Sequence, residues 1–536
     1  MEPKQKKNPK VLVENLKKRN NKLFLALIVV AFYLRLQGVN YGLPYVVNSS
    51  EANNLIQVAN LFRNLPSCLI NSEGINIGPL YLLLSNFVAL ITTHTVSFVN
   101  VLEINVGSLL VPLRFLSVLF GLLSIIVVYF VALRFNTFVA LVSSGLLSVS
   151  MIHVRFSQVF LPFSAVTFFG LLSLYFAIKS SESEKNILLS AYSILVSFLM
   201  HPIGIMNAIP LLFVLLQQNI FLKYKNLFLK IFIIGLLLNL SFFVHLPDIL
   251  LNYVKGYFFY HSNTYFLYAC QILLVAIGPI AYFSLLFFLK YKNDHDLNLI
   301  KVLSSFLFIY IGFLGFVHFT GSEYSMLFIP YFCIFAALFL NSIFQRVKTN
   351  GQQFGFILLM LLLFWIPLKG TLKYNKINTL ADTRVEATEW IKQNTSEDYK
   401  ISWDKNSIQT NWHDAYNIRT LRLLVSDPEV LISKQKFPVT YKLLKEKNWF
   451  KTLKRKVDYV VINSFDYEQT LRQPGNNLEK KYYKQLCKLK PTITFNPYLK
   501  ELEKTTGTLL IEDLNLPLLT LWQRERSGPV IKVYKL

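Results

Sequence analysis

Long apolar blocks fill the first two thirds of the chain, and charged residues are confined mostly to the short segments between them. A helix needs ~20 apolar residues to cross the hydrocarbon core of a bilayer. About eleven blocks approach that length, with helix-compatible composition. The predicted spans are 23–37, 108–132, 137–152, 160–178, 186–200, 202–218, 227–246, 265–289, 297–318, 324–344 and 354–368. We therefore predict a polytopic α-helical membrane protein.

One further apolar block, 79–97, decides the topology. The Lys-rich segment 1–22 is predicted to be cytoplasmic, because positive charge is retained on that side. If 79–97 does not cross the membrane, the outer loops hold almost only Arg63, Arg155 and Lys255 as cations. If it crosses, the charge bias inverts for every later loop. We therefore predict that 79–97 lies in or dips into the outer leaflet.

The last third of the chain has shorter apolar runs and more charge, which is typical of a soluble α/β domain. The predicted elements are a surface helix at 385–394, a buried strand at 457–462, a helix at 482–489 and a closing strand at 530–534. An odd number of spans places this domain outside the cell membrane. The predicted organisation is a cytoplasmic N-terminus (1–22), a transmembrane domain (23–369) with outer loops 38–107 and 246–264, and an extracytoplasmic domain (370–536).

The composition agrees with a multi-pass protein of a cell membrane. Hydrophobic residues make up 53% of the chain and charged residues 16%, whereas soluble domains carry about a quarter charged residues. The formal net charge of +24 favours anionic lipid over nucleic acid as a partner, since no basic groove motif is present. The four cysteines lie far apart, and phosphate-loop, HExxH, GxSxG and CxxC motifs are absent. A nucleotide-driven pump and a zinc peptidase are therefore disfavoured, and no metal site is predicted.

Glu51 is the candidate catalytic residue. It opens a run with Leu55 and Val58 at helical spacing, which predicts an amphipathic helix on the outer membrane interface. A carboxylate there can act as a general base. The alternative is structural: Ser50 caps the helix and Glu51 complements its dipole.

Other polar residues stand where predicted spans meet the outer face, a depth at which polar groups usually line a cavity. Arg155, close to His153, can bind a phosphate in bidentate fashion, or can reach to lipid headgroups. Arg114 can pair with an outer acidic residue or anchor to headgroups. His201, followed by Pro202, is a cavity candidate, or only part of a proline turn.

Two candidates remain at the outer ends of later spans. Tyr324 caps the tenth span, next to Glu323. Lys255 lies in loop 246–264 within an aromatic cluster suited to guiding an acyl or prenyl chain, or forming an interfacial aromatic belt.

These residues follow a recognisable order, and the chain resembles the GT-C superfamily of membrane glycosyltransferases. Within this superfamily it resembles in particular the dolichyl-phosphate-mannose protein mannosyltransferases and the aminoarabinose transferase that modifies lipid A. The resemblance covers nearly the whole chain. Its motifs are Arg35, Gly38, Pro44 and Ser50-Glu51, then Gly78-Pro79-Leu80-Tyr81, Arg114 in Leu113–Ser117, Ser150–Ser157 containing His153 and Arg155, Tyr324 to Pro330, Asp382-Thr383-Arg384, Asp458–Val461 and Gly528–Ile531.

The resemblance implies a function and roles for these residues. Family members take a sugar from a polyprenyl-phosphate donor; an acidic residue in the first outer loop orients or deprotonates the acceptor, and cationic residues hold the leaving phosphate. Here Glu51 would be the carboxylate, and Arg155 and Arg114 would neutralise the phosphate or fix the loop. His153 and His201 would support the cavity. The acceptor would be a glycan, lipid or protein. The resemblance leaves the need for a divalent metal open.

Four polar family positions are substituted in this chain. The first acidic residue of the pair is Ser50, an expected Asp is Phe163, an expected Lys is His201 and an expected Arg is Glu323. These substitutions support an alternative, a catalytically inactive GT-C-like scaffold in envelope glycan assembly. A transporter of a lipid-linked substrate is a third hypothesis, disfavoured because no inverted repeat or intramembrane acid–base chain is evident.

Overall fold

The fold was examined in a computed structural model, which describes most of the helical blocks and much of the C-terminal third. The described residues are 9–43, 45–48, 50–51, 54–55, 57–58, 77–93, 106–239, 272–283, 297–317, 322–395, 399–404, 448–472, 478–499 and 520–536. The chain divides into two compact units. The first unit comprises residues 1–39, 63–88 and 113–372, and the second 40–62, 89–112 and 373–536.

Most described helices coincide with predicted apolar blocks, whereas the predicted span 265–289 is described only at 272–283 and the predicted loop 246–264 lies outside the described residues. The described helices up to residue 394 are α1 (Pro9–Leu36), α4 (Pro79–Thr93), α6 (Val106–Ala132), α7 (Thr137–Val149), α8 (Met151–Ser157), α9 (Phe163–Ile178), α10 (Glu184–Met200), η1 (Pro202–Asn207), α11 (Ala208–Gln217), α12 (Phe221–Leu238), α16 (Leu297–Val317), η2 (Ser322–Leu327), α17 (Ile329–Phe344), α18 (Asn350–Thr379) and α19 (Thr383–Asn394). Three predicted spans are divided: 137–152 between α7 and α8, 202–218 into η1 and α11, and 324–344 into η2 and α17.

Length and composition identify the helices that can cross a membrane unaided. Among the described residues, three apolar stretches pass this test: Leu109–Ala132, Asn298–Gly315 and a window within Asn350–Asn394. The bent pair α7 and α8 would add a fourth. The chain therefore has the helices of a membrane protein, while the count of about eleven spans stays a prediction.

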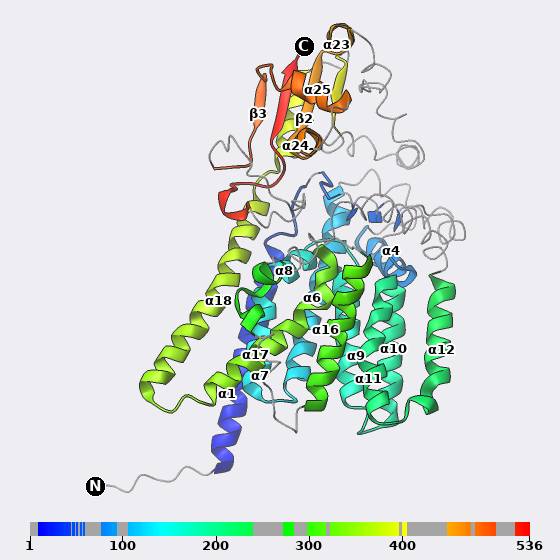
Figure 1. Cartoon of the computed structure of the whole chain (residues 1–536), viewed down its shortest axis with the longest axis vertical. Coiled ribbons are helices and arrows are strands. Elements are labelled where there is room, and N and C mark those ends of the chain that lie inside the picture. The colour runs from blue at the N-terminus through cyan, green and yellow to red at the C-terminus, as the bar shows by residue number, and fades with distance from the viewer. Residues whose placement is uncertain are drawn as a thin grey trace. The chain divides into compact units, whose positions relative to one another are not determined.

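Within the first unit, some packed helices are neighbours in sequence and others are far apart in sequence. Helix α10 packs against α9 and α12, and α17 packs against α7 (Figure 1). The serines of α7 suit this close packing, because Ser143, Ser144 and Ser148 each donate to the backbone carbonyl four residues earlier. At Gly145, a Cβ atom would lie 2.7 Å from the Phe364 ring of α18. Small residues thus let the helices approach without unpaired polar groups.

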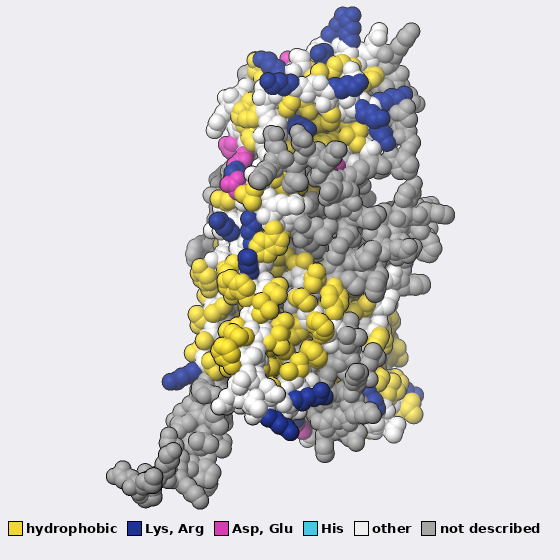
Figure 2. Space-filling view, turned by 60° about the vertical axis from the view of Figure 1, so that its left-hand side comes forward, with side chains coloured by type: hydrophobic (Ala, Val, Ile, Leu, Met, Phe, Trp, Pro, Cys, Tyr) yellow, Lys and Arg dark blue, Asp and Glu magenta, His cyan; other side chains and the backbone are white. Residues whose placement is uncertain are grey.

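Large apolar side chains remain exposed on the first unit. Figure 2 shows hydrophobic side chains gathered over one face of its helical part. Those of α18 are more than half exposed at Phe354, Ile357, Leu358, Leu361 and Leu362. Such a continuous apolar face is what a lipid-facing helix presents.

The second unit contains a four-stranded mixed sheet in the order β1-β2-β4-β3. The strands are β1 (Ile401–Trp403), β2 (Tyr459–Asn463), β3 (Ile493–Phe495) and β4 (Ile531–Lys535), and the helices and turns beside them are α23 (Trp449–Lys456), α24 (Ser464–Arg472), α25 (Leu478–Leu486) and η4 (Leu521–Gln523). β1 and β2 are parallel, and β4 is antiparallel to both β2 and β3. Figure 1 shows α23, α24 and α25 beside the sheet.

The sheet has a hydrophobic cluster on each face, because alternate residues of β2 point to opposite sides. Val460 and Ile462 pack with Tyr482 and Leu486 of α25. On the other face, Val461 packs with the cluster that includes Ala387 and Ile391 of α19. The elements predicted at 385–394, 457–462, 482–489 and 530–534 correspond to α19, β2, α25 and β4. The domain limits drawn from the sequence stay a prediction.

Candidate functional site

A break in an apolar helical stretch organises the polar centre of the first unit. Helices α7 and α8 bend by 62° about Ser150, which has extended backbone angles. Breaking a helix leaves the last carbonyl groups of its first half without intrahelical donors. Residues 146–149 at the end of α7 are buried, so their carbonyls need partners from the protein.

Arg35 of α1 provides much of that partnership. Its side chain is fully buried, and its Nη1 donates to the carbonyls of Ser148 (3.2 Å) and Ala31 (2.9 Å). Thr371 of α18 donates to the carbonyl of Val149 at 2.7 Å. A guanidinium at the C-terminus of α7 also complements the helix dipole. Arg35, which entered the sequence analysis only as a motif residue, is thus a structural partner of the helix break.

The same guanidinium fixes His153. Arg35 Nη2 lies 2.7 Å from His153 Nδ1. Arginine can only donate, so we infer that Nδ1 accepts and the ring proton lies on Nε2. Among the described residues, His153 Nε2 has no hydrogen-bond partner, although the side chain is fully buried. His153 therefore presents an N–H donor inside the first unit.

Arg155 and Gln158 lie on the same buried segment. Arg155 is 1% exposed, so its side chain does not extend to lipid headgroups, one of the two roles considered for it. Gln158 donates to the carbonyl of Leu34 at 2.9 Å, which ties the end of α8 to α1. Gly121 permits close packing here, because a Cβ there would lie 2.2 Å from Ser157 Oγ.

Arg114 is also buried rather than anchored at headgroups. Its side chain is fully buried in α6, and its Nη1 donates to the carbonyl of Val39 at 2.6 Å. Val39 follows the end of α1, where the chain leaves the helix. Arg114 therefore holds the segment that follows α1, and its pairing with an acidic residue stays a prediction.

His201 and Tyr324 meet in an aromatic cluster. Their ring centroids are 6.4 Å apart, and Phe163 lies 5.1 Å from each of them. His201 Nδ1 also accepts from the backbone N–H of Ile203, so the histidine caps η1 as the proline-turn alternative requires. Two of the four substituted family positions, Phe163 and His201, are therefore in contact, and Tyr324 adjoins a third, Glu323.

Glu51 belongs to the second unit and is fully buried. The side chain that closes the turn before it is Asn48, whose Oδ1 accepts from Ser50 N at 3.0 Å. The alternative in which Ser50 caps the helix stays a prediction, because residues 52 and 53, which such a cap would bond, lie outside the described residues. Burial of a carboxylate is costly, which makes the full burial of Glu51 unusual.

The segment that leads to Glu51 is held to α19 by a buried ion pair. Arg384 contacts Asp382 at 2.8 Å and donates to the carbonyl of Val47 at 2.9 Å. Tyr41 donates to Asp382 at 3.2 Å. Burial alone would raise the pKa of Asp382, but the charge and hydrogen bonds of Arg384 and the Tyr41 hydroxyl hold that pKa below its ordinary value.

The structure thus brings some predicted site residues together and leaves others untested. His153 joins Arg35, and His201 joins Tyr324. Glu51 lies in the other unit, so its approach to Arg155 and Arg114 stays a prediction. Lys255 lies outside the described residues. Within the described part of the chain, no group of three or more His, Cys, Asp or Glu residues could hold a metal ion.

Several solved structures are similar to this chain at low sequence identity. The archaeal oligosaccharyltransferase AglB from Archaeoglobus fulgidus, in complex with an inhibitory peptide and a dolichol-phosphate, aligns with a TM-score of 0.51 and 13% identity over 86% of this chain and 72% of its own. The same enzyme tethered to an acceptor peptide aligns with a TM-score of 0.51 and 12% identity, over 85% of this chain and 71% of its own. ArnT from Cupriavidus metallidurans, bound to undecaprenyl phosphate, aligns with a TM-score of 0.47 and 12% identity, over 95% of this chain and 97% of its own.

No protein-family model and no curated protein sequence matches the chain. At 12–13% identity, the likeness to AglB identifies the fold alone. The resemblance drawn from the sequence motifs is therefore confirmed at the level of the fold.

Proposed function

We propose that this chain, which has the fold of the GT-C membrane glycosyltransferases, moves a sugar from a polyprenyl-phosphate donor to an acceptor on the extracytoplasmic face of a cell membrane. The observation that carries the proposal is the likeness to AglB over 86% of the chain. That AglB structure contains a dolichol-phosphate, a lipid carrier of the proposed class. The N-terminus would lie in the cytoplasm and residues 370–536 outside.

Glu51 is the proposed general base or acceptor-orienting carboxylate. It would take the proton of the acceptor hydroxyl as the oxygen attacks C1 of the sugar. The bond between C1 and the phosphate oxygen breaks, and polyprenyl phosphate leaves with the bonding electrons. The burial of Glu51 supports the role, because a side chain held inside the protein can be positioned precisely against the acceptor hydroxyl.

The leaving phosphate needs positive charge and hydrogen-bond donors. Arg155 is the proposed phosphate ligand, and His153 Nε2–H is a suitable second donor, because Arg35 holds the ring and leaves that N–H without a described partner. Arg114 would act chiefly by fixing the loop at Val39. Lys255 is proposed to contact phosphate, and His201 and Tyr324 to border the cavity.

The proposal is tested with the full chain in proteoliposomes, supplied with a panel of polyprenyl-phosphate sugars and with glycan, lipid and peptide acceptors, with and without a divalent metal. Glu51→Gln should lower transfer about 100- to 10,000-fold while insertion persists. Glu184→Gln is the matched control, since Glu184 is an exposed residue whose partner is Lys223. Transfer by Glu51→Gln at the rate of the control would remove the assigned base.

A non-catalytic GT-C-like scaffold is the second candidate. The contact of Phe163 with His201 and Tyr324 favours it, because rings occupy positions where the related enzymes are expected to carry charge. A scaffold would bind polyprenyl phosphate and turn over no donor in the panel. Turnover of any donor by the wild-type chain excludes it.

A further inference from the structure

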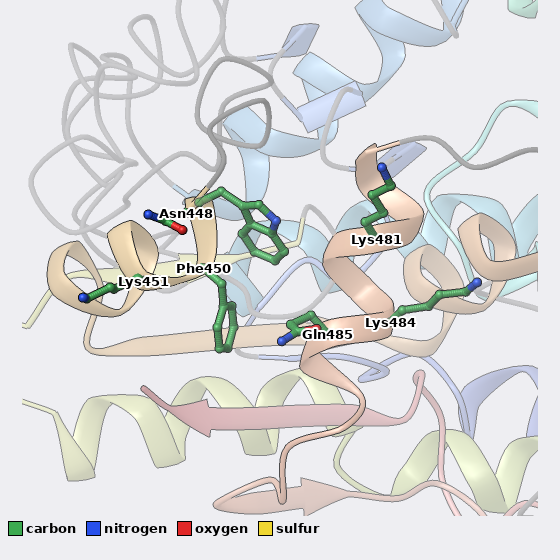
Figure 3. A pocket seen from close by; sticks show the side chains of 7 residues that line it. Asn448, Phe450, Lys451, Lys481, Lys484 and Gln485 are labelled. Atoms are coloured by element: carbon green, nitrogen blue, oxygen red, sulfur yellow. The ribbon is translucent and has the colours of Figure 1, made fainter.

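A basic pocket lies in the second unit, on the helices that cover one face of the sheet. It opens between α23 and α25 and has a volume of about 570 Å³. This volume is within the range of about 300–1,000 Å³ that is usual for small-ligand sites. The lining residues are Asn448, Trp449, Phe450, Lys451, Lys481, Lys484 and Gln485. Figure 3 shows Phe450 and Gln485 on opposite sides of the gap, with Lys481 and Lys484 on α25 and Lys451 on α23.

Aromatic rings form one wall of the pocket. Trp449 and Phe450 are partly buried, and their ring centroids are 5.3 Å apart. Trp449 also lies 5.9 Å from the ring of Tyr482, which belongs to the core of this unit. These contacts hold the indole in place before any ligand arrives, which lowers the entropic cost of binding. An immobilised indole offers an apolar face, against which the C–H groups on one side of a ring-shaped ligand can pack.

The rim is cationic. Lys451, Lys481 and Lys484 are exposed, and none forms an ion pair with an acidic residue in the part of the chain that the structure describes. The helices add to this charge, since α23 has no acidic residue and α25 has only Glu479. The site therefore attracts anions, and its ammonium groups are available to bind them.

The amides of Asn448 and Gln485 complete the lining, and each offers both donors and an acceptor. Aromatic faces, amides and cations in one hollow match a polar ring that bears negative charge. A free phosphate ion would leave the aromatic wall unused, and a lipid surface does not fit a concave site. We propose that the pocket between α23 and α25 binds an acidic oligosaccharide, a chain whose sugar rings carry carboxylate, phosphate or sulfate groups. The proposal concerns binding and does not depend on the transferase activity.

The test measures binding to the full chain in neutral detergent by calorimetry. The probes are an oligogalacturonate tetramer, the neutral tetramer maltotetraose, and inorganic polyphosphate of similar charge. The pocket variant is Lys481→Gln with Lys484→Gln. The matched control is Lys488→Gln with Lys490→Gln, which removes the same charge from exposed positions outside the pocket lining.

Oligogalacturonate should bind about tenfold more weakly to the pocket variant and within about twofold of wild type to the control. Maltotetraose should bind wild type more weakly than oligogalacturonate. The proposal is overturned if both double variants lose affinity for oligogalacturonate equally. It is also overturned if maltotetraose or polyphosphate binds the wild-type chain as tightly as oligogalacturonate does. Competition by vesicles of anionic phospholipid as effective as that by oligogalacturonate would identify a headgroup site instead. Failure of this test would leave the proposed transferase activity unaffected, because that activity is measured separately in proteoliposomes.

Discussion

Replacing Arg35 with methionine should loosen the joint between α7 and α8. The guanidinium donates to two carbonyls at 3.2 Å or less and lies 2.7 Å from His153 Nδ1. At about 1.5–3 kcal/mol for each hydrogen bond to a charged group, three bonds amount to about 5–9 kcal/mol. Removing a buried charge relieves several kcal/mol of desolvation in return. We expect a net loss of about 2–4 kcal/mol in the free energy of unfolding.

Cys333 gives a local reporter for this prediction. It is fully buried in α17, which packs against α7. In a background where Cys68, Cys270 and Cys487 are replaced by serine, a thiol-reactive dye reports the exposure of Cys333 on heating in detergent. The midpoint temperature of Cys333 labelling should be about 5–15 °C lower in Arg35→Met than in wild type, because each kcal/mol of lost stability lowers it by about 2–4 °C.

Two further variants make the result specific. Arg35→Lys should fall between wild type and methionine, because an ammonium cannot reproduce the planar fork that reaches both carbonyl and imidazole. Arg134→Met removes a half-exposed partner of Glu182 and should cost about 0–1 kcal/mol. Equal midpoints for Arg35→Met and Arg134→Met would refute the role of Arg35 in holding the break.

Three other predictions concern single positions. Gly528 has φ +98°, and a Cβ there would lie 2.1 Å from Thr383 Oγ1, so Gly528→Ala should destabilise the second unit by about 1–3 kcal/mol in thermal unfolding. Because the folded-state pKa of Asp382 is lowered, its pairing with Arg384 stabilises fully above about pH 4 and is lost as the pH falls through that folded-state value. The stability difference between wild type and Asp382→Asn should therefore shrink in acid, and a constant difference would contradict the pairing. His201→Lys should destabilise the aromatic cluster by about 1–3 kcal/mol in the dye assay, and adding Phe163→Asp should restore part of that loss; additive losses would show that the two sites are independent.

The pattern of hydrophobic residues predicted those elements, such as β2 and α19, whose buried positions can be identified from their own short stretch of sequence. The run at 457–462 is rich in β-branched residues and is buried on both faces, so it reads as a strand and forms β2. The face made by Ala387 and Ile391 likewise predicted α19. In both cases the sequence pattern and the packed surface carry the same information.

The break at Ser150 could not be predicted in this way. The apolar pattern is continuous through 137–152, and no proline or glycine stands at the break. Its carbonyls are satisfied by Arg35 and Thr371, which lie more than 100 residues away in either direction. The pairing of Arg35 with His153 depends on that same long-range packing, although an arginine inside an apolar span was a signal that could have been followed.

Short elements and the pocket were missed for another reason. β1 and β3 have three residues each and exist because β2 and β4 offer them edges. The helix α23 places only Leu453 fully in the core, so its sequence resembles a charged surface segment. Its pairing with α25, and hence the basic pocket, follows from tertiary packing alone.

A structure of the full chain with polyprenyl phosphate bound tests the central claim most directly. The account predicts the phosphate within hydrogen-bonding distance of Arg155 and His153 Nε2, with the head of the lipid carrier beside Glu51. A phosphate held on another surface, away from both α8 and the carboxylate of Glu51, would contradict the proposed transferase site.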